Sequence, residues 1–144
     1  MAERLGRAPR VYLAHPVTCY GTDHETACIE VLADLLPGVD LCDPAACFAS
    51  SAEWLAAWPG LVGRLDGLVV FADTDGTVGA GVLREVADAV AFDVPVAGLD
   101  LARGLCWVTG FELLDEHARS GRRCATVSLG DPLDAETWLD GERV

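Results

Sequence analysis

Short apolar segments alternate with amphipathic segments along most of this chain, and that alternation constrains the fold more than any other feature. The strongest apolar segment, residues 67–72 (GLVVFA), is a continuous run of the kind that is buried on both faces of a parallel sheet. The alternation predicts an α/β fold with a doubly wound parallel sheet of the flavodoxin or Rossmann type. We expect one domain over residues 1–144, because no repeat, low-complexity tract or linker interrupts the pattern. The other predicted strands are 10–15, 39–42 and 94–97, with weaker ones at 106–108 and 126–129.

Local signals mark where the helices begin and end. Thr22 followed by Glu25 three residues later is a capping-box pattern, and a Pro-Gly pair ends that helix at residue 37. Ser50 or Ser51 can cap the next helix, which we expect to break near Pro59. The predicted helices are 22–36, 50–58, 82–92 and a short one at 132–139.

Composition and charge exclude several classes of protein. The chain is 51% apolar, which excludes disorder, and its net charge of −13 argues against binding a nucleic-acid polymer or an anionic membrane. All ten basic residues are arginines, which either a GC-rich genome or salt adaptation can explain. No signal peptide and no apolar run near the ~18 residues needed to span a bilayer is present, so we expect a cytoplasmic protein with reduced thiols.

Three loops follow the predicted strands at residues 15–21, 43–51 and 73–81. In an open parallel sheet, ligands bind beyond the carboxyl ends of the strands, where such loops meet. The first and third loops carry the unusual residues. Their convergence is therefore the predicted site.

The third loop and the helix after it hold the predicted catalytic carboxylates. Gly79 and Gly81 allow close backbone approach to a ligand, and Glu85 lies one turn into the helix. A carboxylate there can attack a sugar anomeric carbon or stabilise an oxocarbenium ion. Asp73 and Asp75 can bind ribose hydroxyls, activate water or coordinate Mg²⁺. The alternatives are that Glu85 only complements the helix dipole and that both aspartates are turn residues.

The first loop supplies predicted substrate contacts. His15 can act as an acid or bond a base edge, and Tyr20 can stack on a nucleobase or sugar; the alternatives are a structural histidine and loop packing. The spacing of His15, His24, Cys19 and Cys28 matches no standard zinc pattern. We therefore predict no metal and no cofactor.

Three stretches together resemble the nucleoside 2-deoxyribosyltransferase-like family: VYLAHP at 11–16, LDGLVVFADTDG at 65–76 and GAGVLREVADAVAFDVPV at 79–96. The family has a flavodoxin-like sheet shared with nucleotide N-glycosidases. The resemblance implies that Glu85 is the nucleophilic or oxocarbenium-stabilising glutamate. It implies that Asp73 or Asp75 is the acid that contacts the sugar or handles the proton.

Other assignments stay open at this point. Residues 79–85 are also similar to the GGxGTxxE loop of LOG-type phosphoribohydrolases, which cleave the same kind of bond. Val82 stands where both families have threonine, so a non-catalytic nucleotide sensor of the same fold is a second hypothesis. An interaction module whose tryptophans form a partner surface is a third.

The scarcity of arginine bears on the ligand, which we predict to be a nucleoside or a nucleoside 5′-monophosphate. Arg84 is the arginine nearest the glycine-rich loop, and a phosphate would rest on it and on backbone amides. Members of the family are commonly dimers with shared sites, so we expect a homodimer. A neighbouring subunit can then lend Arg119, Arg122 or Arg123.

Overall fold

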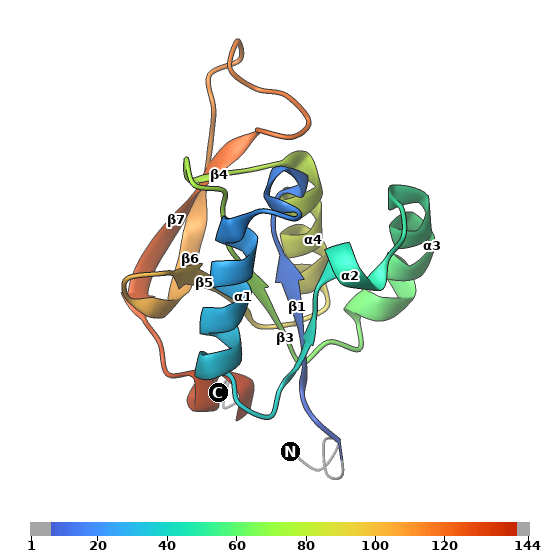
Figure 1. Cartoon of the computed structure of the whole chain (residues 1–144), viewed down its shortest axis with the longest axis vertical. Coiled ribbons are helices and arrows are strands. Elements are labelled where there is room, and N and C mark those ends of the chain that lie inside the picture. The colour runs from blue at the N-terminus through green and yellow to red at the C-terminus, as the bar shows by residue number, and fades with distance from the viewer. Residues whose placement is uncertain (1–6, 141–144) are drawn as a thin grey trace.

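Seven strands form one sheet with helices packed against it in the computed structural model, which describes residues 7–140 (Figure 1). This confirms the α/β class. The strand order is β2-β1-β3-β5-β6-β7-β4. The strands are β1 (Arg10–Ala14), β2 (Asp40–Cys42), β3 (Gly67–Val70), β4 (Thr77–Val78), β5 (Val96–Asp100), β6 (Gly104–Leu113) and β7 (Ala125–Pro132). The helices are η2 (Val17–Cys19), α1 (Asp23–Leu35), α2 (Pro44–Cys47), α3 (Ser51–Val62), α4 (Ala80–Ala91) and α5 (Ala135–Asp140).

The sheet is mixed, so the prediction of an entirely parallel sheet was wrong for its second half. β1 pairs in parallel with β2 and β3, and β3 pairs in parallel with β5. β6 pairs antiparallel with β5 and β7, and β4 pairs antiparallel with β7. Only residues 101–103 separate β5 from β6. A connection that short permits a hairpin but no crossover helix, so antiparallel pairing follows.

Most helix boundaries follow the local signals. The Thr22 hydroxyl caps α1 by accepting from the Glu25 amide, and the Ser50 hydroxyl caps α3 in the same way from Glu53. α3 continues past Pro59 to Val62 instead of breaking there. The predicted loops at 43–51 and 73–81 contain the short elements α2 and β4.

The core has two parts, one on each face of the parallel strands. Alternate residues of β1 and β3 point to opposite faces, as strand geometry requires. Tyr12 and Leu68 belong to the cluster that packs against α3 and α4. Leu13 and Val69 belong to the cluster that packs against α1 and α5. The continuous apolar character of residues 67–70 is explained by burial on both faces.

The tryptophans and cysteines are placed as follows. Trp58 and Trp138 are buried and Trp107 is half exposed, so the four tryptophans do not form one surface. The six cysteines are free thiols. Among residues 7–140, no helix combines the length and apolar character that a membrane span requires.

Candidate functional site

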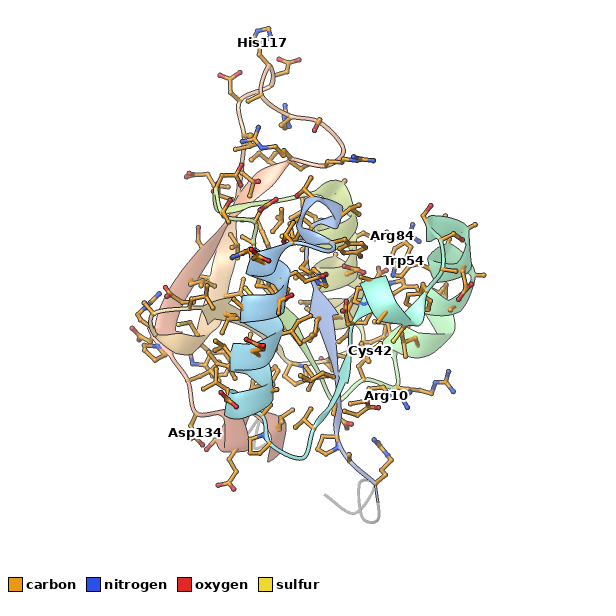
Figure 2. All side chains as sticks on the ribbon, in the orientation of Figure 1. Arg10, Cys42, Trp54, Arg84, His117 and Asp134 are labelled. Atoms are coloured by element: carbon orange, nitrogen blue, oxygen red, sulfur yellow. The ribbon has the colours of Figure 1, made fainter. Side chains whose placement is uncertain are left out.

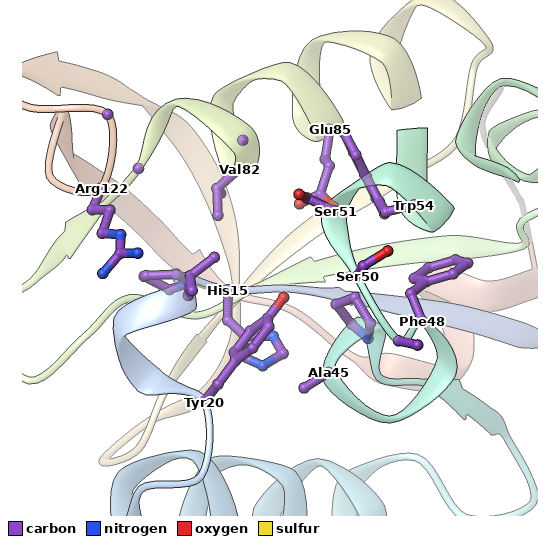
Figure 3. A pocket seen from close by; sticks show the side chains of 17 residues that line it. His15, Tyr20, Ala45, Phe48, Ser50, Ser51, Trp54, Val82, Glu85 and Arg122 are labelled. Carbon is purple, nitrogen blue, oxygen red and sulfur yellow. The ribbon is translucent and has the colours of Figure 1, made fainter. Parts of the chain in front are cut away.

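A pocket of about 500 Å³ lies where the loops after β1 and β2 meet the start of α4 (Figure 3). Residues from all three predicted loops line it, together with the first turns of α3 and α4 and the loop between β6 and β7. Figure 3 shows Arg122 on one side of the pocket and Glu85, Ser51 and Trp54 on the other. The lining residues are His15, Pro16, Val17, Tyr20, Pro44, Ala45, Phe48, Ala49, Ser50, Ser51, Trp54, Gly79, Gly81, Val82, Glu85, Gly121 and Arg122.

Glu85 lies in the wall of this pocket and is held by a short chain of hydrogen bonds. Trp54 Nε1–H donates to the Tyr12 hydroxyl oxygen over 3.0 Å, and the Tyr12 hydroxyl donates to Glu85 Oε2. Because the Trp54 donor occupies the oxygen of Tyr12, the hydroxyl proton is directed at the carboxylate. Tyr12 has no exposed surface and Glu85 is 6% exposed. The glutamate is therefore fixed in position with one oxygen bound to Tyr12.

Burial governs the protonation of this pair. Desolvation raises the pKa of Glu85 from 4.5 to about 8, although the hydrogen bond from Tyr12 acts in the opposite direction. Desolvation, followed by the nearby Glu85 charge, raises the pKa of Tyr12 well above its usual range. The tyrosine thus stays a donor at all accessible pH values. The glutamate is neutral in most molecules at pH 7.

His15 lines the pocket, but both of its ring nitrogens are engaged elsewhere. Nδ1–H donates to the Leu13 carbonyl oxygen over 2.8 Å, and Nε2 lies 2.7 Å from Glu25 Oε2. The ring stacks on Phe71 with centroids 4.4 Å apart, and the ring of Tyr20 lies 5.1 Å away. The structure thus places the ring in the pocket wall while its nitrogens point to protein groups. Tyr20 is partly exposed at the same wall.

Asp73 and Asp75 are not among the lining residues, so the structure does not bring these predicted catalytic groups to the pocket. Asp73 accepts a hydrogen bond from the Thr18 hydroxyl, which lowers the pKa of its carboxyl. Asp75 accepts from the backbone and the hydroxyl of Thr77, which lowers its pKa, and it pairs with Arg123 at 3.1 Å. Both carboxylates serve the turn between β3 and β4, as the alternative interpretation proposed.

The arginine at the pocket is Arg122 and not Arg84. Arg84 lies on the exposed side of α4, where its guanidinium stands 5.8 Å above the Trp54 ring and 3.7 Å from Asp88 (Figure 2). Arg122 reaches the pocket from the loop between β6 and β7 of the same chain. The pocket thus has a cationic side chain without any contribution from a neighbouring subunit.

Gly79 and Gly81 both line the pocket, but for different reasons. A Cβ on Gly79 would lie 2.9 Å from the carbonyl oxygen of Gly121 and 3.0 Å from that of Arg122. The amide of Ala80 donates to that Gly121 oxygen over 2.9 Å. Gly79 therefore permits close approach by the β6–β7 loop of its own chain. A Cβ on Gly81 would meet nothing within 4 Å, so packing does not require glycine at this position.

Sequence reasoning missed several residues that build the site. Tyr12 is an interior residue of a predicted strand, and nothing local indicates that its hydroxyl faces Glu85. Trp54 lies in the predicted helix 50–58, and nothing local indicates that its indole N–H reaches Tyr12. Glu25 was assigned to a capping box, yet its carboxylate bonds His15 and the Gly21 amide. The only available signal was the occurrence of polar groups at the carboxyl ends of neighbouring strands.

Comparison with known proteins adds no further assignment to this geometry. No protein-family model, no curated protein and no solved structure matches the chain.

Proposed function

We propose that this protein cleaves or transfers at the N-glycosidic bond of a nucleoside or a nucleoside 5′-monophosphate, with Glu85 as the acting carboxylate. The observation that carries the proposal is a buried glutamate, hydrogen-bonded to a tyrosine, in the wall of a pocket of about 500 Å³. Pockets of this size hold small ligands. The resemblance of residues 11–16 and 79–96 to the nucleoside 2-deoxyribosyltransferase-like family supports the same chemistry.

The parts of the pocket fit the parts of such a substrate. Tyr20, Phe48 and Trp54 offer aromatic surface to a nucleobase, and the hydroxyls of Ser50 and Ser51 are donors and acceptors for sugar groups. Arg122 and the amides at the start of α4 offer positive charge for a phosphate. The strand order β2-β1-β3-β5 supports a doubly wound, flavodoxin-like arrangement for this part of the sheet.

The proposed reaction starts from the ionised carboxylate. One oxygen of Glu85 remains bound to Tyr12 while the other attacks the anomeric carbon, and the bond to the base breaks. The electron pair of that bond leaves with the base, which takes up a proton from solvent water. Water, or a second base in a transferase, then displaces Glu85 from the sugar. In a transferase, burial of Glu85 limits the access of water to the glycosyl ester until the second base enters.

The test is a panel of nucleosides and 5′-monophosphates incubated with the full chain, with free base measured by liquid chromatography. We expect base release by the wild type and a loss of at least about a thousandfold in Glu85→Gln. Glu53→Gln, which changes an exposed glutamate on α3, is the matched control and should retain full activity. Equal rates for wild type and Glu85→Gln would refute the catalytic proposal.

A nucleotide-binding sensor is the second candidate, favoured by the neutral state of Glu85 at pH 7. A sensor binds its ligand without releasing base. At a ligand concentration of 100 Kd it would be stabilised by about 2.7 kcal/mol. Thermal unfolding with each ligand of the panel detects binding, which both candidates predict. The base-release assay on the same ligands then distinguishes the two candidates, because only the enzyme consumes its ligand.

The homodimer implied by the family resemblance is part of this proposal. Since Arg122 comes from the same chain, we expect the pocket to bind its ligand in the monomer too. Analytical ultracentrifugation over a range of concentrations measures the oligomeric state directly.

A further inference from the structure

Three side chains with metal-binding atoms converge beside the pocket. His15 follows β1, Glu25 lies in the first turn of α1, and Asp43 caps α2. Nε2 of His15 lies 2.7 Å from Glu25 Oε2 and 3.6 Å from Asp43 Oδ1, and one ligand atom from each residue lies within 4.8 Å of the others. The His15 side chain is fully buried and that of Glu25 is 11% exposed. An ion between ligands at about 2.1 Å sets their atoms about 3.0–3.4 Å apart, a value that lies between the two distances from Nε2 to the carboxylates.

The hydrogen bond from Nδ1 of His15 leaves its Nε2 facing the carboxylates of Glu25 and Asp43. Nδ1–H donates to the Leu13 carbonyl oxygen, so Nε2 of the neutral ring presents a lone pair to the two carboxylates. A proton between Nε2 and Glu25, or a metal ion, removes the repulsion between the lone pair and the carboxylate oxygens. A single proton there bonds one carboxylate well. A metal ion binds the nitrogen and both oxygens together.

Each of the three candidate ligands is also held by a backbone group. The Leu13 carbonyl orients the His15 ring, the Gly21 amide donates to Glu25 Oε1 over 2.9 Å, and the Ala45 amide donates to Asp43 Oδ1 over 3.0 Å. Such outer hydrogen bonds orient the ligands in metal sites. The three groups are therefore arranged before any ion arrives.

We propose that His15, Glu25 and Asp43 bind one divalent first-row transition ion, Zn²⁺ or Mn²⁺, at the wall of the pocket. One imidazole and two carboxylates suit these ions, whereas Mg²⁺ and Ca²⁺ prefer oxygen ligands alone. The two carboxylates balance the double positive charge. The site adjoins the pocket through His15, Pro44 and Ala45, which line it. This site goes beyond the proposed Glu85 chemistry, which requires no ion.

The test is calorimetric titration of the full chain, stripped with chelator, with Zn²⁺, Mn²⁺ and Mg²⁺. We expect one Zn²⁺ or Mn²⁺ per chain and much weaker binding of Mg²⁺. Glu25→Gln and Asp43→Asn each remove one ionic ligand while keeping an oxygen that accepts from the backbone. Each should weaken binding by at least about tenfold. Glu53→Gln, an exposed change, should bind as the wild type does.

A thiol control separates this site from the cysteine pair, since Cys42 Sγ and Cys47 Sγ lie 3.6 Å apart and thiolates also bind zinc. Cys47→Ser, which changes an exposed residue, should leave Mn²⁺ and Zn²⁺ binding unchanged. The proposal is overturned by an absence of binding, by wild-type affinity in both Glu25→Gln and Asp43→Asn, or by loss only in Cys47→Ser. If neither carboxylate variant folds, nitrogen NMR of wild-type histidines decides. A His15 Nε2 that still carries a proton in saturating Zn²⁺ overturns the proposal, and loss of that proton supports it.

Discussion

Replacing Glu85 by glutamine is expected to stabilise the protein by an amount that grows with pH. Glutamine has the same shape, its side-chain oxygen can still accept from Tyr12, and it does not ionise. The pKa of Glu85 is about 8 in the folded protein against 4.5 in the unfolded chain. The folded state therefore binds more protons than the unfolded state between these values, and the free energy of unfolding falls as pH rises.

The magnitude follows from that interval. The stabilisation from the neutral buried carboxyl is complete below pH 4.5 and is lost as pH rises to about 8. Each pH unit corresponds to about 1.4 kcal/mol, so the whole interval corresponds to about 5 kcal/mol. The free energy of unfolding of Glu85→Gln minus that of the wild type should thus increase by about 4 kcal/mol between pH 5 and pH 8. This is a large share of the ~5–15 kcal/mol that holds a typical domain folded.

Urea unfolding followed by tryptophan fluorescence at several pH values measures this difference. Carboxylates with lowered pKa values, such as Asp73 and Asp75, titrate alike in both proteins, so their contributions cancel. Glu30→Gln, on the exposed side of α1, is the control and should give a difference that does not change with pH. A difference for Glu85→Gln that stays constant within about 1 kcal/mol from pH 5 to pH 8 refutes the reasoning. In that case the carboxyl is solvated in solution.

Three further predictions concern the pocket. Tyr12→Phe removes the hydrogen-bond donor to Glu85, so the pKa of Glu85 should rise further. As a result, kcat/KM for base release should fall about ten- to hundredfold at pH 7, and the rising limb of the pH–rate profile should shift to higher pH. Gly79→Ala should lower the free energy of unfolding by about 1–3 kcal/mol, because the added methyl group meets backbone oxygens, whereas Gly81→Ala should not lower it. Urea unfolding measures both variants, and an equal decrease in the free energy of unfolding would contradict this prediction. Arg122→Ala should raise the Kd of a 5′-monophosphate about tenfold while leaving that of the corresponding nucleoside unchanged, and equal effects in calorimetry would remove Arg122 from phosphate binding.

Much of the first half of the fold could be predicted because its signals are local. The hydroxyls of Thr22 and Ser50 cap their helices through amides three residues away, and this spacing is visible in the sequence. The continuous apolar run at residues 67–70 predicts a strand buried on both faces, and the structure shows that burial. The position of Glu85 one turn into a helix after a glycine-rich loop also placed it at the carboxyl edge of the sheet.

Pairing over long distances could not be predicted in this way. The sequence predicts strands at residues 106–108 and 126–129, shorter than the observed β6 and β7, and it carries no information on whether they run parallel or antiparallel to β5. The length of the connection between β5 and β6 decided that question. Likewise, Arg122 belongs to a loop that folds back over Gly79 only because β6 and β7 pair.

The sequence alone determined the α/β class, most helix ends and the acidic balance of the chain, since each depends on residues close together or on simple counts. Tertiary structure alone decided which polar groups meet. Glu85 accepts a hydrogen bond from Tyr12, 73 positions away in the sequence. The carboxylate of Glu25, which was expected to cap its own helix, lies instead against His15. The physical reason is that a buried polar group must find a partner wherever packing places one. Packing of whole elements, which no short segment encodes, therefore sets the chemistry of the pocket.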